Sequence, residues 1–273
     1  MLYPRQTPAF KGGWWFYVLI YGLFTVGCAD RTRTIDIPEG RYLELAPDTA
    51  DPDRPIPLLV YFHSYQNSAE SYSRRSWLTQ TANERGYLLI LPDGLQQSWS
   101  AVGAPSARRD EIAFLRAVLD SVNERWSISE DKVVGGFSAG AFLTWDVACY
   151  MGDAFSAFIP SAGTFWDPVP KSCPYPAPIR HTHGTADKTV PLEGRSIGSA
   201  RQGNVYEAFG TMRSTNGCDD QSEEIVVGET SCSVWSNCTT DKELQLCLHQ
   251  GGHTNPSGYL DDSLDWAEGM TPL

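Results

Sequence analysis

The chain has few basic residues and no cluster of them. Its 273 residues include 21 Lys and Arg against 33 Asp and Glu, which gives a formal net charge of −12 at pH 7. Phosphate backbones are bound by concentrated basic surfaces, so this composition argues against a nucleic-acid partner. The sequence also has no internal repeat and no low-complexity tract. Its hydrophobic residues, 41% of the total, suffice for a buried core.

The apolar run near the N-terminus is too short for a membrane span. Trp14–Val26 has 13 residues, whereas a transmembrane helix needs roughly 20. Arg5 and Lys11 precede this run, as basic residues precede the core of a signal peptide. Small residues stand directly before Cys28, as at a bacterial lipoprotein cleavage site. We therefore predict an exported protein in which residues 1–28 are a signal peptide and Cys28 is a candidate for a lipid anchor, with ordinary cleavage nearby or an uncleaved anchor as alternatives.

The other six cysteines include no C-x-x-C pair, so a structural zinc site has little support. An even number of cysteines in an exported protein predicts disulfides. Spacing favours a bridge between Cys149 and Cys173, because no cysteine intervenes. The remaining four crowd into a C-terminal segment and leave their pairing open. Among the possible pairs we favour Cys218–Cys238 and Cys232–Cys247.

Residues 29–273 are predicted to form a single α/β catalytic domain, because short apolar strands alternate with helical patterns. We expect strands at Tyr42–Leu45, Pro57–Phe62, Tyr87–Leu91, Lys132–Gly135, Ala157–Pro160, Pro178–Thr182, Glu224–Val227 and Leu244–Leu248. We expect helices at Ala69–Arg85, Arg109–Trp126, Ala139–Met151, Val205–Thr215 and Ser257–Glu268. This alternation predicts a mostly parallel sheet covered by helices on both faces. Reactive groups then gather at the carboxyl ends of the strands.

The segment Gly136-Phe137-Ser138-Ala139-Gly140 follows an apolar strand and opens a helix. A G-x-S-x-G turn in this position holds the serine in a strained conformation with its hydroxyl clear of the sheet. The glycines are needed because a Cβ would clash in so tight a turn. The following helix directs its N-terminal amides toward the reaction centre. Ser138 is therefore the candidate nucleophile.

A serine nucleophile needs a base, and the base needs a carboxylate to orient it. In hydrolases of this type the chain order is Ser, acid, His. His249 and His253 both lie far enough downstream, and His253 is preferred because it follows two glycines in a loop. Asp187 comes just beyond an expected strand and is the candidate acid. His181 and His183 have strand spacing, but without nearby acids they make a poor metal site.

An oxyanion needs hydrogen-bond donors. One candidate is the backbone N–H of Ala139, and the other is that of Tyr65 or Ser64, in the loop after Pro57–Phe62. The chemistry requires no metal or cofactor. Aromatic side chains suit acyl or sugar groups, although core packing is the commoner role for each of them taken singly. The substrate-contact candidates are His63, Trp99, Phe165 and Trp166.

These motifs together resemble the α/β-hydrolase family that includes polyhydroxybutyrate depolymerases and feruloyl esterases. The matching pieces lie between about residues 40 and 268 and are Phe62-His63-Ser64, Leu91-Pro92-Asp93-Gly94 with Trp99, Asp110-Glu111-Ile112-Ala113-Phe114-Leu115, Gly136-Phe137-Ser138-Ala139-Gly140, His183-Gly184-Thr185-Ala186-Asp187 and Gly251-Gly252-His253-Thr254. By this resemblance, Ser138, Asp187 and His253 match the catalytic positions, and the C-terminal cysteines match the family's disulfide region. The chain departs from the family at Ser64, where Gly is usual, and at Asn255, where Trp is common.

The resemblance implies an exported serine esterase that acts through an acyl-enzyme. A feruloyl or acetyl esterase on plant polysaccharide is the first expectation, a polyhydroxybutyrate depolymerase is the second and a peptidase is the third. The partner is then an ester substrate. A non-catalytic cell-surface binding protein on a hydrolase scaffold is the alternative of another class. The intact Ser, Asp and His, in the correct order, argue against it.

Overall fold

The structure is a computed structural model that describes residues 1–2, 32–51 and 53–270. Residues 3–28 of the predicted signal peptide, including Cys28, lie outside the described residues. All helices and strands below belong to the unit that begins at residue 31. None of the helices described is both long enough and apolar enough to cross a membrane.

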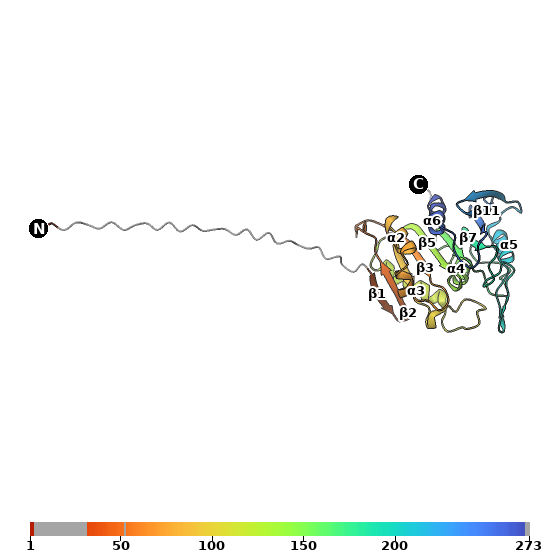
Figure 1. The fold of residues 1–273 in the computed structure, drawn as a ribbon, viewed down its shortest axis with the longest axis horizontal. Coiled ribbons are helices and arrows are strands. Elements are labelled where there is room, and N and C mark those ends of the chain that lie inside the picture. The colour runs from red at the N-terminus through yellow and green to blue at the C-terminus, as the bar shows by residue number, and fades with distance from the viewer. Residues whose placement is uncertain (3–31, 52, 271–273) are drawn as a thin grey trace. The chain divides into compact units, whose positions relative to one another are not determined.

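A ten-stranded sheet runs through this unit (Figure 1). Its order is β1-β2-β4-β3-β5-β6-β7-β12-β11-β10. The strands are β1 (Thr32–Ile37), β2 (Gly40–Leu45), β3 (Ile56–Phe62), β4 (Leu88–Pro92), β5 (Ile128–Phe137), β6 (Ala157–Ser161), β7 (Ile179–Gly184), β10 (Glu223–Val227), β11 (Thr230–Trp235) and β12 (Leu244–His249). A separate two-stranded hairpin consists of β8 (Ser196–Ile197) and β9 (Ala200–Arg201).

The six middle strands, β4, β3, β5, β6, β7 and β12, are parallel, and the two strands at each side are antiparallel. Parallel strands place their carboxyl ends at one edge of the sheet, so the loops after β3, β5, β7 and β12 gather there. Figure 1 shows β1 and β11 toward opposite sides of the sheet.

Helices cover both faces, as expected. The larger core packs α3 (Glu111–Asn123), α4 (Ala139–Tyr150) and α5 (Val205–Asn216) against side chains such as Val60 and Val134. The other core packs α1 (Ala69–Ser73), α2 (Ser76–Glu84) and α6 (Tyr259–Gly269) against strand side chains such as Tyr61 and Val133. Strand side chains alternate between the two cores because successive residues point to opposite faces.

The expected helix Ala69–Arg85 is two helices. The break falls at Arg75, which has an extended backbone with φ −86° and ψ 102°. Tyr72 and Leu78 are both buried, at 2% and 0% exposure. In one continuous helix, six residues of separation would place them about 120° apart, so the break lets both face the core. A short 3-10 turn, η1 (Leu95–Gln97), follows β4.

Strands β1 and β11 were not expected from the sequence. In β1 the side chains are mostly exposed or half-buried, so no apolar run marks it. In β11 the buried positions are Thr230, Cys232 and Val234. Thr230 and Cys232 do not stand out as apolar residues, so the sequence shows no clear alternation there. Their pairing with neighbouring strands creates these elements, which local sequence reasoning does not see.

The described residues contain three disulfides: Cys149–Cys173, which the spacing favoured, and Cys218–Cys238 and Cys232–Cys247, the pairs preferred among the open alternatives. Cys149 lies near the end of α4 and Cys173 in the loop before β7. Cys232 and Cys247 stand directly opposite each other on β11 and β12. The last bridge therefore ties the sheet's antiparallel side to β12, whose end carries the loop with His253.

The double variant Cys232→Ala, Cys247→Ala should be less stable by about 3 kcal/mol, because the bridge closes a 15-residue separation in the unfolded chain. Urea denaturation of the oxidised proteins measures this loss. The double variant Cys218→Ala, Cys238→Ala, with a separation of 20 residues, is the matched control and should lose a similar amount. A midpoint equal to wild type without reductant would contradict the role assigned to the Cys232–Cys247 bridge.

Candidate active site

Ser138 stands at a sharp turn between β5 and α4. Its backbone has φ 56° and ψ −119°, a conformation that L-residues rarely adopt. The flanking glycines permit the turn. A Cβ on Gly136 would lie 2.5 Å from the backbone of Gly140, and a Cβ on Gly140 would lie 2.2 Å from the carbonyl oxygen of Phe62. Any larger residue at either position would push the turn apart.

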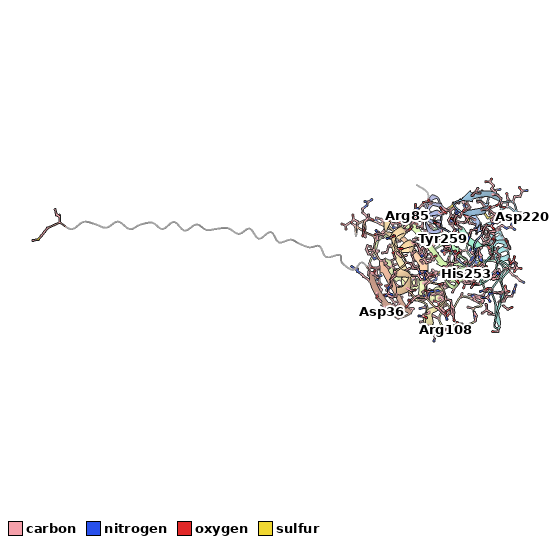
Figure 2. All side chains as sticks on the ribbon, in the orientation of Figure 1. Asp36, Arg85, Arg108, Asp220, His253 and Tyr259 are labelled. Carbon is pink, nitrogen blue, oxygen red and sulfur yellow. A yellow bond between two sulfur atoms is a disulfide. The ribbon has the colours of Figure 1, made fainter. Side chains whose placement is uncertain are left out.

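His253 bridges Ser138 and Asp187. The Ser138 hydroxyl lies 2.9 Å from His253 Nε2, and His253 Nδ1 lies 2.6 Å from Asp187 Oδ2. Because an ionised carboxylate only accepts hydrogen bonds, Nδ1 carries the proton and Nε2 is free to accept one from Ser138. This arrangement gives the serine a base and the base a fixed orientation. Figure 2 labels His253 within the outline of the described unit.

Asp187 is held as a carboxylate. Its Oδ1 accepts hydrogen bonds from the backbone N–H groups of Thr189 at 2.8 Å and Val190 at 2.9 Å. Burial alone would raise the pKa of the Asp187 carboxyl. The hydrogen bonds from His253, Val190 and Thr189 outweigh that effect, and the pKa lies below its usual value. A negative charge is thus fixed beside the imidazole N–H.

The loops that carry Asp187 and His253 are joined by backbone hydrogen bonds. Thr185 N–H donates to His249 O at 2.8 Å, and Ala186 N–H donates to Gly251 O at 3.0 Å. These bonds continue the parallel pairing of β7 with β12 beyond the strand ends. His249, the alternative base, is buried in β12, and its Nδ1 accepts the N–H of Gly251. The structure therefore presents His253, and not His249, to Ser138.

The imidazoles of His181 and His183 bond to each other behind the acid. His183 Nε2 donates to Val190 O at 2.7 Å, so His183 Nδ1 accepts from His181 Nε2 at 2.9 Å. Burial lowers the pKa of both side chains, which keeps them neutral. They support the loop that holds Asp187.

Two backbone N–H groups are free to receive an oxyanion. Among the described residues, nothing accepts a hydrogen bond from the N–H of Ala139 or of Tyr65. The N–H of Ser64, the alternative donor, is already used, because it donates to the Tyr72 hydroxyl at 3.1 Å. Ala139, Tyr65 and Ser138 line the same cavity of about 510 Å³, which we call the nucleophile cavity.

His63 does not contact this cavity, so its assignment as a substrate contact was wrong. It is buried, with Nδ1 donating to Ser64 O at 2.9 Å and Nε2 accepting from Gly94 N–H at 2.9 Å. Its own carbonyl accepts the indole N–H of Trp99 at 2.7 Å. His63 therefore fixes the loop that carries the Tyr65 N–H. Burial lowers the pKa of its imidazole, which keeps this bonding pattern.

Trp99 and Trp166 line the nucleophile cavity, whereas Phe165 does not. Phe165 is 1% exposed and packs on Trp145 in the core, so its assignment as a substrate contact was also wrong. Phe142, which was not expected there, lines the cavity and packs on Trp166 with ring centroids 4.8 Å apart. A signal for it was present, because residues four apart on a helix share a face and Phe142 follows Ser138 by four.

A second cavity, of about 540 Å³, is lined by His253 and is called the histidine cavity. Phe137, Tyr72 and Trp77 contribute aromatic surface to it together with His253. Asn255, where the resembling family often has Trp, also lines it, and its side chain bonds to the Ser161 hydroxyl. Ser138 lines the nucleophile cavity and His253 lines the histidine cavity, so each of these two side chains borders a cavity of its own.

Comparisons with known proteins agree with this architecture. No family model matches the chain. Poly(3-hydroxyalkanoate) depolymerase C of Paucimonas lemoignei is 28% identical over 117 residues, which are 39% of this chain and only 28% of the depolymerase's length. An acetyl xylan esterase from Aspergillus awamori superposes with a TM-score of 0.66 at 15% identity, covering 88% of this chain and 99% of the esterase.

A feruloyl esterase module from Clostridium thermocellum, solved with sinapinate as an S954A mutant, superposes with a TM-score of 0.56 at 12% identity. It covers 88% of this chain and 86% of the module. The strand order, the turn at Ser138 and these superpositions agree. The chain has the α/β-hydrolase fold.

Asp146 holds one wall of the nucleophile cavity. It lies in α4 at 2% exposure, and its Oδ2 accepts the backbone N–H of Val102 at 2.7 Å. Val102 follows Ala101, which lines the cavity. Burial raises the pKa of the Asp146 carboxyl to about 7, and the bond from Val102 offsets this only in part. The carboxyl therefore titrates near neutral pH.

Asp146→Asn should stabilise the protein at pH 8, by up to about 4 kcal/mol, with the gain shrinking toward pH 4. Between about pH 4 and 7 the folded protein keeps a proton that the unfolded chain has lost. Unfolding releases this proton over that range, so the fold becomes less stable as the pH rises. Asparagine keeps an acceptor for Val102 and removes the charge.

Urea denaturation at pH 4.5, 6 and 8 measures this difference. Asp153→Asn is the control, because Asp153 is exposed just after α4 and should show no such trend. A stability difference between Asp146→Asn and wild type that stays constant with pH would contradict the titration assigned to Asp146.

Proposed function

We propose that the protein is a serine carboxylic-ester hydrolase that works through an acyl-enzyme. One observation carries the proposal: a continuous hydrogen-bonded chain from the Ser138 hydroxyl through His253 to Asp187. Two unpaired backbone N–H groups face the same cavity as the serine. A nucleophile, an oriented base and donors for an oxyanion are the parts that acyl transfer needs.

In the first half-reaction, Ser138 Oγ attacks the ester carbonyl while His253 Nε2 takes its proton. The imidazolium is stabilised by the Asp187 carboxylate. The carbonyl oxygen becomes an oxyanion that accepts hydrogen bonds from the N–H groups of Ala139 and Tyr65. The tetrahedral intermediate then collapses, His253 Nε2 gives its proton to the leaving alkoxide, and the alcohol departs from an acyl-serine ester.

In the second half-reaction, water takes the place of the alcohol. His253 removes a proton from the water as its oxygen attacks the acyl carbon. A second oxyanion forms at the same two N–H groups. Its collapse breaks the bond to Ser138 Oγ, which regains the proton from His253 and releases the carboxylic acid. No group outside the chain and the substrate is consumed except water.

The first candidate substrate is a feruloyl or acetyl ester on plant polysaccharide. The aromatic surfaces of Trp99, Phe142 and Trp166 suit a phenolic acid or a sugar ring. The likeness of the fold to an acetyl xylan esterase and to a feruloyl esterase module supports this choice. A short polyhydroxyalkanoate ester is the second candidate, favoured by the sequence likeness to a poly(3-hydroxyalkanoate) depolymerase.

Export through the signal peptide 1–28, with Cys28 as the lipid-attachment residue, is part of the same proposal. Three disulfides suit an oxidising compartment outside the cytosol. An enzyme at the cell envelope or outside the cell meets polymeric esters that do not enter cells.

Ser138→Ala should lower kcat for 4-nitrophenyl acetate by about 10⁶-fold, because no other group can form the acyl-enzyme. Release of 4-nitrophenolate measures the rate, and circular dichroism checks that the fold is retained. Ser127→Ala is the control, since Ser127 is exposed just before β5, at the opposite end of that strand from Ser138. Equal turnover by wild type and Ser138→Ala, or none by either, would favour a non-catalytic binding protein.

Methyl ferulate, acetylated xylan and a hydroxybutyrate oligomer, assayed side by side, rank the substrate candidates.

A further inference from the structure

The nucleophile cavity has the opposite charge to the protein around it. The chain carries 33 acidic and 21 basic residues. The described residues that line the cavity include Arg108 and Arg195 but no Asp or Glu. Arg108 lies in the loop after β4, and Arg195 lies in the loop after β7. Two separate segments thus bring positive charge to the space in front of Ser138.

Both arginines lack an acidic partner. Among the described residues, no carboxylate forms an ion pair with either side chain. Arg201, in contrast, is paired with Asp167 at 2.9 Å. That pair lines a neighbouring hollow, which shares Ala104 and Pro105 with the nucleophile cavity. Arg108 and Arg195 therefore leave the nucleophile cavity with positive charge that no carboxylate of the described residues neutralises in an ion pair.

Each guanidinium is anchored through one nitrogen only. Arg108 Nη1 donates to the Ser106 hydroxyl at 3.1 Å, and Arg195 Nε donates to Thr189 O at 2.7 Å. The remaining N–H groups have no partner among the described residues. Their loops are also fixed, because the backbone N–H of Arg108 donates to Ser100 Oγ at 2.9 Å. Arg108 lies at the margin of the molecule in Figure 2. Anchored guanidiniums with free donors are suited to a planar carboxylate.

We propose that the nucleophile cavity selects ester substrates that carry a carboxylate, held by Arg108 and Arg195 while Ser138 attacks the ester. This inference rests on the proposed function and narrows its substrate class. A cavity of about 510 Å³ is far larger than an acetyl group needs, and its aromatic walls leave the two arginines as its charged groups.

The carboxylate has two possible places in the substrate. It lies in the acyl part of a dicarboxylic-acid monoester. It lies in the alcohol part when the ester is on a polysaccharide that bears uronic acids, or when a hydroxyalkanoate oligomer ends in a free acid. The same guanidinium chemistry recognises both, so the experiment includes a matched pair of substrates for each.

For the acyl part, 4-nitrophenyl hydrogen adipate is compared with its neutral methyl ester. For the alcohol part, 3-acetoxybutanoate is compared with its methyl ester, with acetate release as the readout. Wild type should prefer the charged member of at least one pair by about tenfold in kcat/KM at low ionic strength. This preference should fall as salt screens the charges.

Arg108→Gln and Arg195→Gln should each lower kcat/KM for the preferred charged ester about fivefold and leave the neutral ester within twofold. Arg116→Gln is the matched control, because Arg116 is exposed on α3, lies outside this cavity and carries the same charge. Equal effects of the three substitutions would point to net charge alone and overturn the proposal. No preference for a charged ester in either pair would also overturn it.

A binding measurement separates this proposal from the proposed function. Ser138→Ala should bind monomethyl adipate or 3-acetoxybutanoate in calorimetry, and adding Arg195→Gln should weaken that binding about fivefold. If wild type hydrolyses neutral esters but neither anion binds, the carboxylate site is wrong and the esterase stands. If an anion binds through the arginines but no ester is hydrolysed, the carboxylate site stands and the esterase is wrong.

Discussion

The close contact between Gly140 and the end of β3 is the constraint on which the site depends. A Cβ on Gly140 would come within 2.2 Å of the Phe62 carbonyl oxygen, so the first turn of α4 lies directly against the backbone of the neighbouring strand. Ala139 directly precedes Gly140 in the chain, and Tyr65 lies three residues after Phe62. The packed backbone therefore fixes the start of α4, with the Ala139 N–H, against the end of β3, from which the Tyr65 loop departs. Preorganised donors of this kind stabilise developing charge without a further cost of reorganisation.

The residues around this contact serve mainly to keep the Tyr65 loop in place. His63 accepts the N–H of Gly94 and receives the Trp99 indole at its carbonyl, while the Tyr72 hydroxyl takes the N–H of Ser64. Two of the sequence motifs and Tyr72 thus meet at one loop. Ser64 does not disturb it, although glycine is usual there in the resembling family, because its backbone N–H is satisfied and its hydroxyl accepts from Asn67 at 3.0 Å.

The sequence predicted the candidate triad because each member follows a local rule: a G-x-S-x-G turn, an acid after a strand and a histidine after glycines. Chain order and parallel topology then place their ends together, and the structure brings Ser138, Asp187 and His253 within hydrogen-bond range. His63 and Phe165 were wrongly assigned as substrate contacts, because no local rule fixes which way their side chains point. Aromatic residues look alike in a sequence, and only tertiary packing turns one toward a cavity and another, such as Phe165, toward Trp145. Strand β11 and the break at Arg75 likewise arise from packing partners remote in the chain.

A single loop links the candidate acid to the proposed carboxylate site. Thr189 donates its N–H to Asp187 and accepts the Arg195 side chain at its carbonyl. Because Arg195 and Asp187 are bonded to the two sides of one residue, the proposed carboxylate site and the candidate acid share one backbone segment. The peptide groups of Thr189 thus lie between the positively charged Arg195 side chain and the negatively charged Asp187 carboxylate. This separation lets the site attract an anion while Asp187 stays bonded to His253 and leaves Nε2 free to take the serine proton.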